Sequence, residues 1–155
     1  MPEIVLECKA DETLVKSLGY PHKMITHQPS RGEVINYLRK NPGSIGIVDD
    51  DPQSAKPNYF FKFQRETVEK FNVESFCINK LNTRLIIIKP KLEDWILKHA
   101  ISIKINPLDY SFSDDGNKVH KIINSRLFQF RNMLNEMIER NSPALTYLKE
   151  LIDKS

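Results

Sequence analysis

The segment Gly43-Ser44-Ile45-Gly46-Ile47-Val48-Asp49-Asp50-Asp51-Pro52 predicts a buried parallel strand that ends in three acidic residues. Short apolar runs rich in β-branched side chains are typical of strands buried on both faces of a sheet. Ligands of open α/β sheets bind outside the carboxyl ends of the strands, so the triplet is expected at a functional edge. Asp49 and Asp51 alternate along the chain and could both face one cation. The alternative is a solvated acidic turn that Pro52 closes.

Two strand-and-helix units are predicted before this strand. Residues 4–6 and 23–26 are expected to form short strands. Asp11 is expected to cap the helix after the first strand, and Ser30 begins a capping-box pattern for the helix after the second. The β-α-β-α-β order predicts parallel pairing with right-handed crossovers.

The second half of the chain predicts one strong strand, over residues 83–88, and several helices. The helix after that strand has Glu93 in an acidic first turn, which places Glu93 near the carboxyl end of a strand. An acidic first turn also simply favours the start of a helix, and this reading stays open. The other expected elements are a short helix over residues 65–71, a strand over 75–78, and helices over 119–139 and 143–152.

Length and pattern together predict the fold class α/β. A chain of 155 residues fits one domain with a substantial core. We expect a Rossmann-like α/β core over residues 1–105, with a central, mostly parallel sheet flanked by helices. Residues 106–155 are expected to form a helical C-terminal extension that packs on this core.

Charge and hydropathy restrict the partners. The net charge is +3, with −1 over residues 1–75 and +4 over 76–155, which is compatible with a polyanionic substrate held near a metal. No apolar run is long enough for a membrane helix, and the N-terminus lacks a signal-peptide layout. We therefore expect a cytoplasmic protein without membrane contact. Cys8 and Cys77 are expected to be free core thiols.

The acidic positions and their order resemble the Toprim domain. This domain is the catalytic module of topoisomerases, bacterial primases and the nucleases of the overcoming-lysogenisation-defect family. Residues 7–12 resemble its Glu-(small or Gly)-x-x-Asp opening, and residues 45–51 resemble its Asp-x-Asp strand. Residues 87–97 are similar to a strand-Pro-x-Leu-Glu-x-Trp segment of small Toprim-like proteins from bacteria, which also end in a helical tail. The resemblance covers residues 3–100.

The resemblance implies a Mg²⁺ or Mn²⁺ site. In the family, acidic residues hold Mg²⁺, and the glutamate is proposed as a general acid/base in phosphodiester cleavage or joining. By position, Glu7, Asp49 and Asp51 would be the catalytic residues and metal ligands. Mg²⁺ prefers a few carboxylates together with water and phosphate oxygens, which suits this set. The second-rank residues are Asp11 and Asp50 as further ligands and Glu93 as a helper.

The chain departs from the larger Toprim proteins in what it lacks. It has no topoisomerase tyrosine domain, no primase zinc module and no ATPase P-loop, so a protein partner would have to supply ATPase activity or DNA docking. A phosphate-anchoring base is expected among Lys9, Lys89 and Lys91, which follow predicted strands. The sequence does not choose among them.

A second resemblance, to response-regulator receivers, is much weaker. Residues 47–52 also resemble the acidic opening strand of a receiver, which requires an aspartate at the end of a strand some 40 to 50 residues later. The strand over residues 83–88 leads into Lys89 and Pro90 instead, and two strand-and-helix units already precede the triplet.

The leading functional hypothesis is therefore a Mg²⁺-dependent nuclease-type phosphodiesterase that acts on nucleic acid. The alternative is a non-catalytic Toprim-like accessory or binding subunit that works with a separate ATPase or DNA-processing partner. A nucleotide- or phosphate-binding α/β protein with unrelated chemistry is a third class. The choice between DNA and RNA and the oligomeric state stay open.

Overall fold

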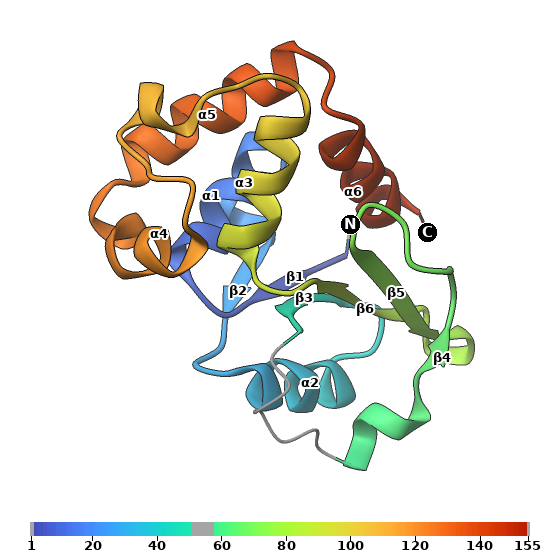
Figure 1. The fold of residues 1–155 in the computed structure, drawn as a ribbon. Coiled ribbons are helices and arrows are strands. Elements are labelled where there is room, and N and C mark those ends of the chain that lie inside the picture. Colours follow the sequence, from blue (N-terminus) through green and yellow to red (C-terminus); the bar gives the residue numbers. More distant parts are fainter. Residues whose placement is uncertain (1, 51–57, 155) are drawn as a thin grey trace.

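The computed structural model describes residues 2–50 and 58–154, which form a six-stranded sheet with helices on both faces (Figure 1). The strands are β1 (Ile4–Leu6), β2 (Ile25–His27), β3 (Ile45–Asp49), β4 (Gln64–Arg65), β5 (Val73–Ile78) and β6 (Thr83–Ile88). The helices are α1 (Lys9–Ser17), α2 (Arg31–Lys40), α3 (Leu92–Ser102), α4 (Gly116–Ile122), α5 (Leu127–Glu139) and α6 (Pro143–Asp153).

The strand order in the sheet is β2-β1-β3-β6-β5-β4. The neighbours β2, β1, β3 and β6 pair in parallel, and β5 and β4 extend the sheet beyond β6 in antiparallel pairing. The predicted α/β class with a mostly parallel sheet is thus confirmed. The opening β-α-β-α-β order is also confirmed, since β1 pairs in parallel with both β2 and β3.

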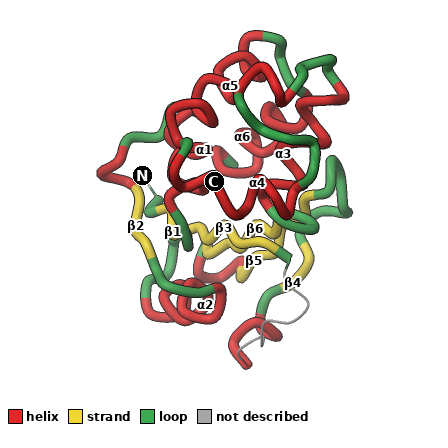
Figure 2. Tube along the Cα trace, turned by 60° about the vertical axis from the view of Figure 1, so that its left-hand side comes forward, coloured by secondary structure: helices red, strands yellow, loops and turns green. Residues whose placement is uncertain are grey.

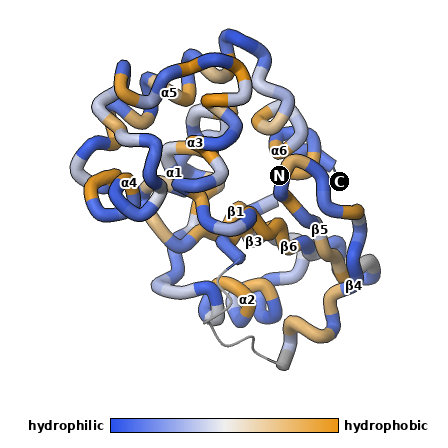
Figure 3. Tube along the Cα trace, viewed as in Figure 1, coloured by the Kyte–Doolittle hydropathy of each residue, from blue (hydrophilic) through white to orange (hydrophobic). Residues whose placement is uncertain are grey.

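The helices divide unequally between the two faces. Figure 2 shows α2 on one face and α1, α3, α5 and α6 on the other. Strands in the middle of the sheet are therefore covered twice, and Figure 3 shows them as an apolar layer between more polar helices. On the α2 side, Val34, Ile35 and Leu38 pack on Val48 and Leu85. This double burial explains the unbroken apolar runs of β3 and β6.

The larger core joins the sheet to the C-terminal helices. Leu134 in α5 and Leu148 in α6 are fully buried, in the same cluster as Ile4 and Ile86 from the sheet. Buried Arg84 of β6 adds a polar tie, because its Nη1 donates to the Leu151 carbonyl oxygen at 2.8 Å. Within the described residues, no helix is long and apolar enough to cross a membrane.

Helix α1 begins earlier than predicted. Its N-cap is Cys8, so Asp11 is the third helical residue and not the cap. A thiol can replace the usual hydroxyl here because the Asp11 side chain completes a capping box. Ser30 caps α2 as predicted, with its Oγ accepting the Glu33 N–H at 3.1 Å.

One predicted helix is wrong, and a second is wrong in part. No helix forms over residues 65–71, since Glu66 N–H bonds to the Ser75 carbonyl oxygen and Phe71 and Asn72 turn the chain with positive φ. The predicted helix over 119–139 is interrupted between α4 and α5 by a 3-10 turn, Ile123–Ser125. The Ser125 hydroxyl bonds back to the Ile122 carbonyl oxygen there, a local alternative to helical pairing.

Candidate functional site

Four carboxylates meet at the carboxyl edge of the parallel strands. Glu7 follows β1, Asp49 ends β3, and Glu93 lies in the first turn of α3, just after β6. Because β1, β3 and β6 are parallel neighbours, their carboxyl ends share one edge. Asp11 joins the group from the first turn of α1. These four residues are called the carboxylate cluster below.

The cluster contains buried oxygens that lack hydrogen bonds. Asp11 and Glu93 are only 5% and 4% exposed. Among the described residues, nothing bonds to the buried Asp49 Oδ1 or the buried Glu93 Oε2. Burying an unpaired charged oxygen is costly, so such atoms call for a proton or a cation.

Burial and mutual repulsion raise the pKa values of two carboxyl groups in the cluster. Burial, reinforced by the charges of Asp11, Glu93 and Glu7, raises the pKa of Asp49 to about 8. Burial raises the pKa of Asp11 to about 7, and Glu7 and Glu93 add to the rise while hydrogen bonds with Cys8 oppose it. Asp49 and Asp11 therefore resist ionisation at neutral pH unless a counter-charge lies beside them.

Asp11 also holds the start of α1. Its Oδ2 accepts the Cys8 N–H at 3.3 Å, and its own N–H lies 3.5 Å from Cys8 Sγ. Burial raises the pKa of the Cys8 thiol, so Cys8 is a capping group and not an activated nucleophile. Asp11 is thus partly structural.

The acidic triplet contributes Asp49 to this edge. Asp50 is half-buried, and its N–H extends the β3–β6 pairing by donating to the Ile88 carbonyl oxygen at 2.8 Å. Asp51, the predicted third catalytic residue, lies outside the described residues.

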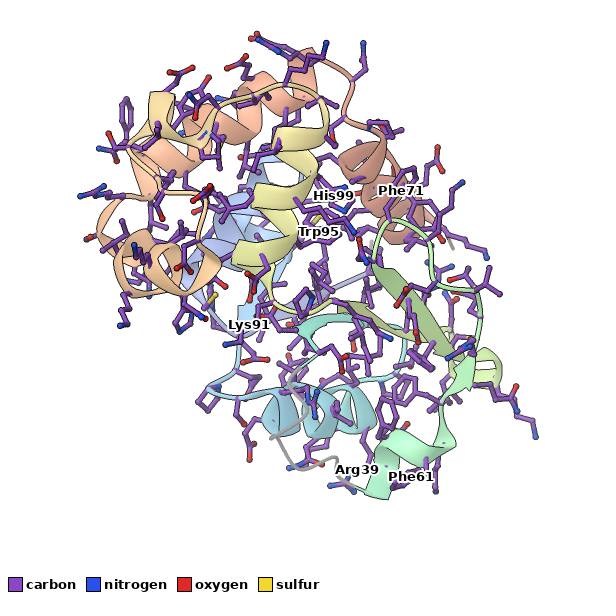
Figure 4. All side chains as sticks on the ribbon, viewed as in Figure 1. Arg39, Phe61, Phe71, Lys91, Trp95 and His99 are labelled. Carbon is purple, nitrogen blue, oxygen red and sulfur yellow. The ribbon has the colours of Figure 1, made fainter. Side chains whose placement is uncertain are left out.

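The three predicted phosphate-anchoring lysines differ in their surroundings. Lys89 is engaged, with Nζ 2.5 Å from Glu74 Oε1 and 3.2 Å from Glu69 Oε1, so it is a poor phosphate anchor. Lys91 is exposed at the N-cap of α3 (Figure 4). Lys9 is the exposed first residue of α1. Neither Lys91 nor Lys9 forms an ion pair with a described residue.

Two residues near the cluster escaped the sequence analysis. Arg31 of α2 is buried, and its Nη1 donates to the backbone oxygen of Asp49 at 3.4 Å. His120 of α4 places Nδ1 3.1 Å from Glu93 Oε1. No local pattern marks either one, because each reaches the cluster through the packing of a different helix.

The carboxylate oxygens of the cluster suit a hard cation such as Mg²⁺ whose remaining ligands are water and phosphate oxygens. Within the described residues, no three His, Cys, Asp or Glu side chains are placed to hold a metal ion together. Mg²⁺ is typically held by one or two carboxylates, with water and substrate phosphates completing the shell. Asp49 and Glu93, with their unpartnered oxygens, fit that smaller requirement.

Comparison of the chain with protein-family models, curated proteins and solved structures finds no match.

Proposed function

We propose that this protein is a Mg²⁺-dependent phosphodiesterase of the Toprim type that acts on nucleic acid. The observation that carries the proposal is the carboxylate cluster, in which Asp49 Oδ1 and Glu93 Oε2 are buried without partners in the described part of the chain. Clusters of buried acids with raised pKa values are more typical of functional sites than of structural ones.

Each acid has a role in this proposal. Asp49 and Glu93 would hold the cation, and Asp51 is the further ligand that the sequence pattern supplies. Glu7, half-buried at the end of β1, would transfer the proton of the attacking or leaving group. Bound Mg²⁺ supplies stabilisation of the charge on the scissile phosphate.

Metal binding is the first test. The protein is stripped with EDTA, dialysed, and melted with and without Mn²⁺ or Mg²⁺. A ligand at about 100 times its Kd adds about 2.7 kcal/mol to the free energy of unfolding, which raises Tm by several degrees. Asp49→Asn should abolish the rise. Asp114→Asn, at an exposed aspartate, should retain it.

Cleavage is the second test. Labelled single-stranded and double-stranded DNA and RNA are incubated with the metal-loaded protein, with EDTA as the blank. We expect cleavage that Asp49→Asn lowers at least a hundredfold. Undiminished cleavage by Asp49→Asn would contradict the proposal. So would a wild-type Tm that neither Mn²⁺ nor Mg²⁺ changes.

A non-catalytic accessory subunit is the second candidate. The observation that favours it is that no three described donors are placed to hold a metal together. Absence of cleavage of all four substrates, with or without stabilisation by metal, would favour this candidate. A partner protein would then supply the missing chemistry.

A further inference from the structure

A groove of 680 Å³ lies between α1 and α5. One wall is a stripe of α1 that includes Lys9 and Lys16, and the other is the first half of α5, with Phe128 and Arg131. Lys9, which lines one end of this stripe, is two residues from Glu7 in the sequence. Apart from Lys9, a candidate phosphate anchor, the residues of this groove take no part in the chemistry proposed above.

The groove carries an uncompensated positive charge. Lys9, Lys16 and Arg131 are all exposed, and none forms an ion pair with a described residue. The one acid in the lining, Glu12, is already engaged: its oxygens lie 2.6 Å from His22 Nδ1 and 2.9 Å from His27 Nε2. Three cations therefore remain available to an anionic ligand.

The groove also displays an aromatic ring. Phe128 is 74% exposed, whereas Phe130, Met133, Leu134 and Met137 of the same helix are buried. Aromatic rings beside cations are the usual way in which proteins bind single-stranded nucleic acid, because every base can stack on them.

The spacing of the cations suits a polyanion. Lys9 and Lys16 are seven residues apart on α1, which corresponds to about 10 Å along the helix. Each strand of a duplex carries one phosphate for about every 3.4 Å of helix axis, and phosphates lie farther apart in an extended single strand. The two lysines can thus contact different phosphates of one strand, which a mononucleotide does not offer.

We propose that the groove between α1 and α5 binds a single-stranded segment of nucleic acid, with Lys9, Lys16 and Arg131 on its phosphates and Phe128 stacked on a base. This inference rests on the proposed function for the class of ligand, and on the groove for its location. The strand runs from the carboxylate cluster along α1.

Binding of a fluorescein-labelled 20-nucleotide dT oligonucleotide, followed by anisotropy in EDTA at several salt concentrations, tests the charges. The triple variant Lys9→Gln/Lys16→Gln/Arg131→Gln should bind at least tenfold more weakly. Its slope of log K against log salt should be shallower by about 2, at about 0.7 for each lost single-strand contact.

The matched control is Arg39→Gln/Lys40→Gln/Lys80→Gln. It removes the same charges, two lysines and one arginine, from exposed positions without ion pairs to described residues. Arg39 and Lys40 belong to α2, on the other face of the sheet from α1 and α5 (Figures 2 and 4). Equal weakening in both triple variants would mean diffuse attraction and would overturn the proposal.

The ring is tested by Phe128→Ala against Phe61→Ala. Phe61 is also 74% exposed, but it lies beyond α2 (Figure 4). We expect about a tenfold loss of affinity for Phe128→Ala, as for one lost base stack, and none for Phe61→Ala. No loss for Phe128→Ala, or binding of dTMP as tight as that of the oligonucleotide, overturns the proposal.

Failure of this inference is distinguishable from failure of the proposed function. Mn²⁺ stabilisation that depends on Asp49, combined with no oligonucleotide binding, rejects the groove and leaves the metal site standing. Oligonucleotide binding that needs the groove cations, combined with a Tm that ignores both metals, supports the groove and rejects the phosphodiesterase.

Discussion

His120 Nδ1 lies 3.1 Å from Glu93 Oε1, so a helix of the C-terminal part reaches the carboxylate cluster. Glu93 is almost fully buried, and its other oxygen has no partner among the described residues. His120→Ala removes the contact and leaves a buried carboxylate with less compensation. We expect the free energy of unfolding in urea to fall by about 1–3 kcal/mol.

The control for His120→Ala is His22→Ala. His22 contacts Glu12 at a more open site, where ion pairs contribute about 0–1 kcal/mol. An equal loss in the two variants would contradict the idea that the His120–Glu93 contact matters because Glu93 is buried.

The pKa of Asp49 predicts how stability depends on pH without divalent cations. Its folded-state pKa of about 8 exceeds the unfolded value of about 4. The folded state therefore holds a proton that the unfolded state releases across this range, and stability falls as pH rises from 4 to 8. Asp11, with its pKa raised to about 7, acts in the same direction.

Thermal melting in EDTA between pH 5 and 9 measures this effect. Asp49→Asn should weaken the decline and melt above wild type at pH 8, because the amide carries no charge. Asp114→Asn, at an exposed aspartate, should follow wild type. A wild type that melts higher at pH 8 than at pH 5 would show that another group dominates.

The parallel part of the fold was predictable because its signals are local. The apolar runs of β3 and β6 and the Ser30 cap each depend on a few neighbouring residues. The turn at Phe71 and Asn72 was not predictable, since residues 65–71 also suit a helix and pairing with β5 decides against it.

The candidate site was predictable only where it follows the strands. Glu7, Asp49 and Glu93 come directly after strand patterns, and parallel pairing brings them to one edge. His120 reaches the cluster because the chain breaks at Ile123–Ser125, which lets α4 pack on α3. Periodicity predicts a continuous helix over 119–139, and such a helix gives no reason to expect the contact between His120 and Glu93.

Gly46 sets how closely α2 approaches the sheet. A Cβ at this position would lie 2.9 Å from both Leu38 Cδ1 and Val34 Cγ1, and 3.2 Å from Leu85 Cδ1. These methyl groups are packed in the core and have little room to move, so Gly46→Ala should destabilise the fold by about 1–3 kcal/mol. Urea denaturation measures the change.

Gly32→Ala provides the opposite control for Gly46→Ala. At Gly32, in α2, the nearest atom to a new Cβ is Ser30 Oγ at 3.9 Å. Replacing a helical glycine by alanine where space permits stabilises by about 0.5–1 kcal/mol. Loss of stability at Gly32 or gain at Gly46 would contradict this account of the α2 interface.

Leu148 of α6 tests whether the C-terminal helices fold as one unit with the sheet. Its side chain is fully buried in the cluster that contains Ile4 and Ile86, so Leu148→Ala opens a cavity in a core shared with β1 and β6. We expect a loss of about 2–5 kcal/mol in a single cooperative transition. Leu108→Ala, at a leucine that is 69% exposed, should cost under about 0.5 kcal/mol. The same variant tests cooperativity. If the helices formed a separate unit, Leu148→Ala would split the unfolding transition in two, and the far-UV circular dichroism signal would fall before the fluorescence of Trp95 changes. Coincident curves from the two probes are expected instead, because Trp95 of α3 lies in the same cluster as Leu148.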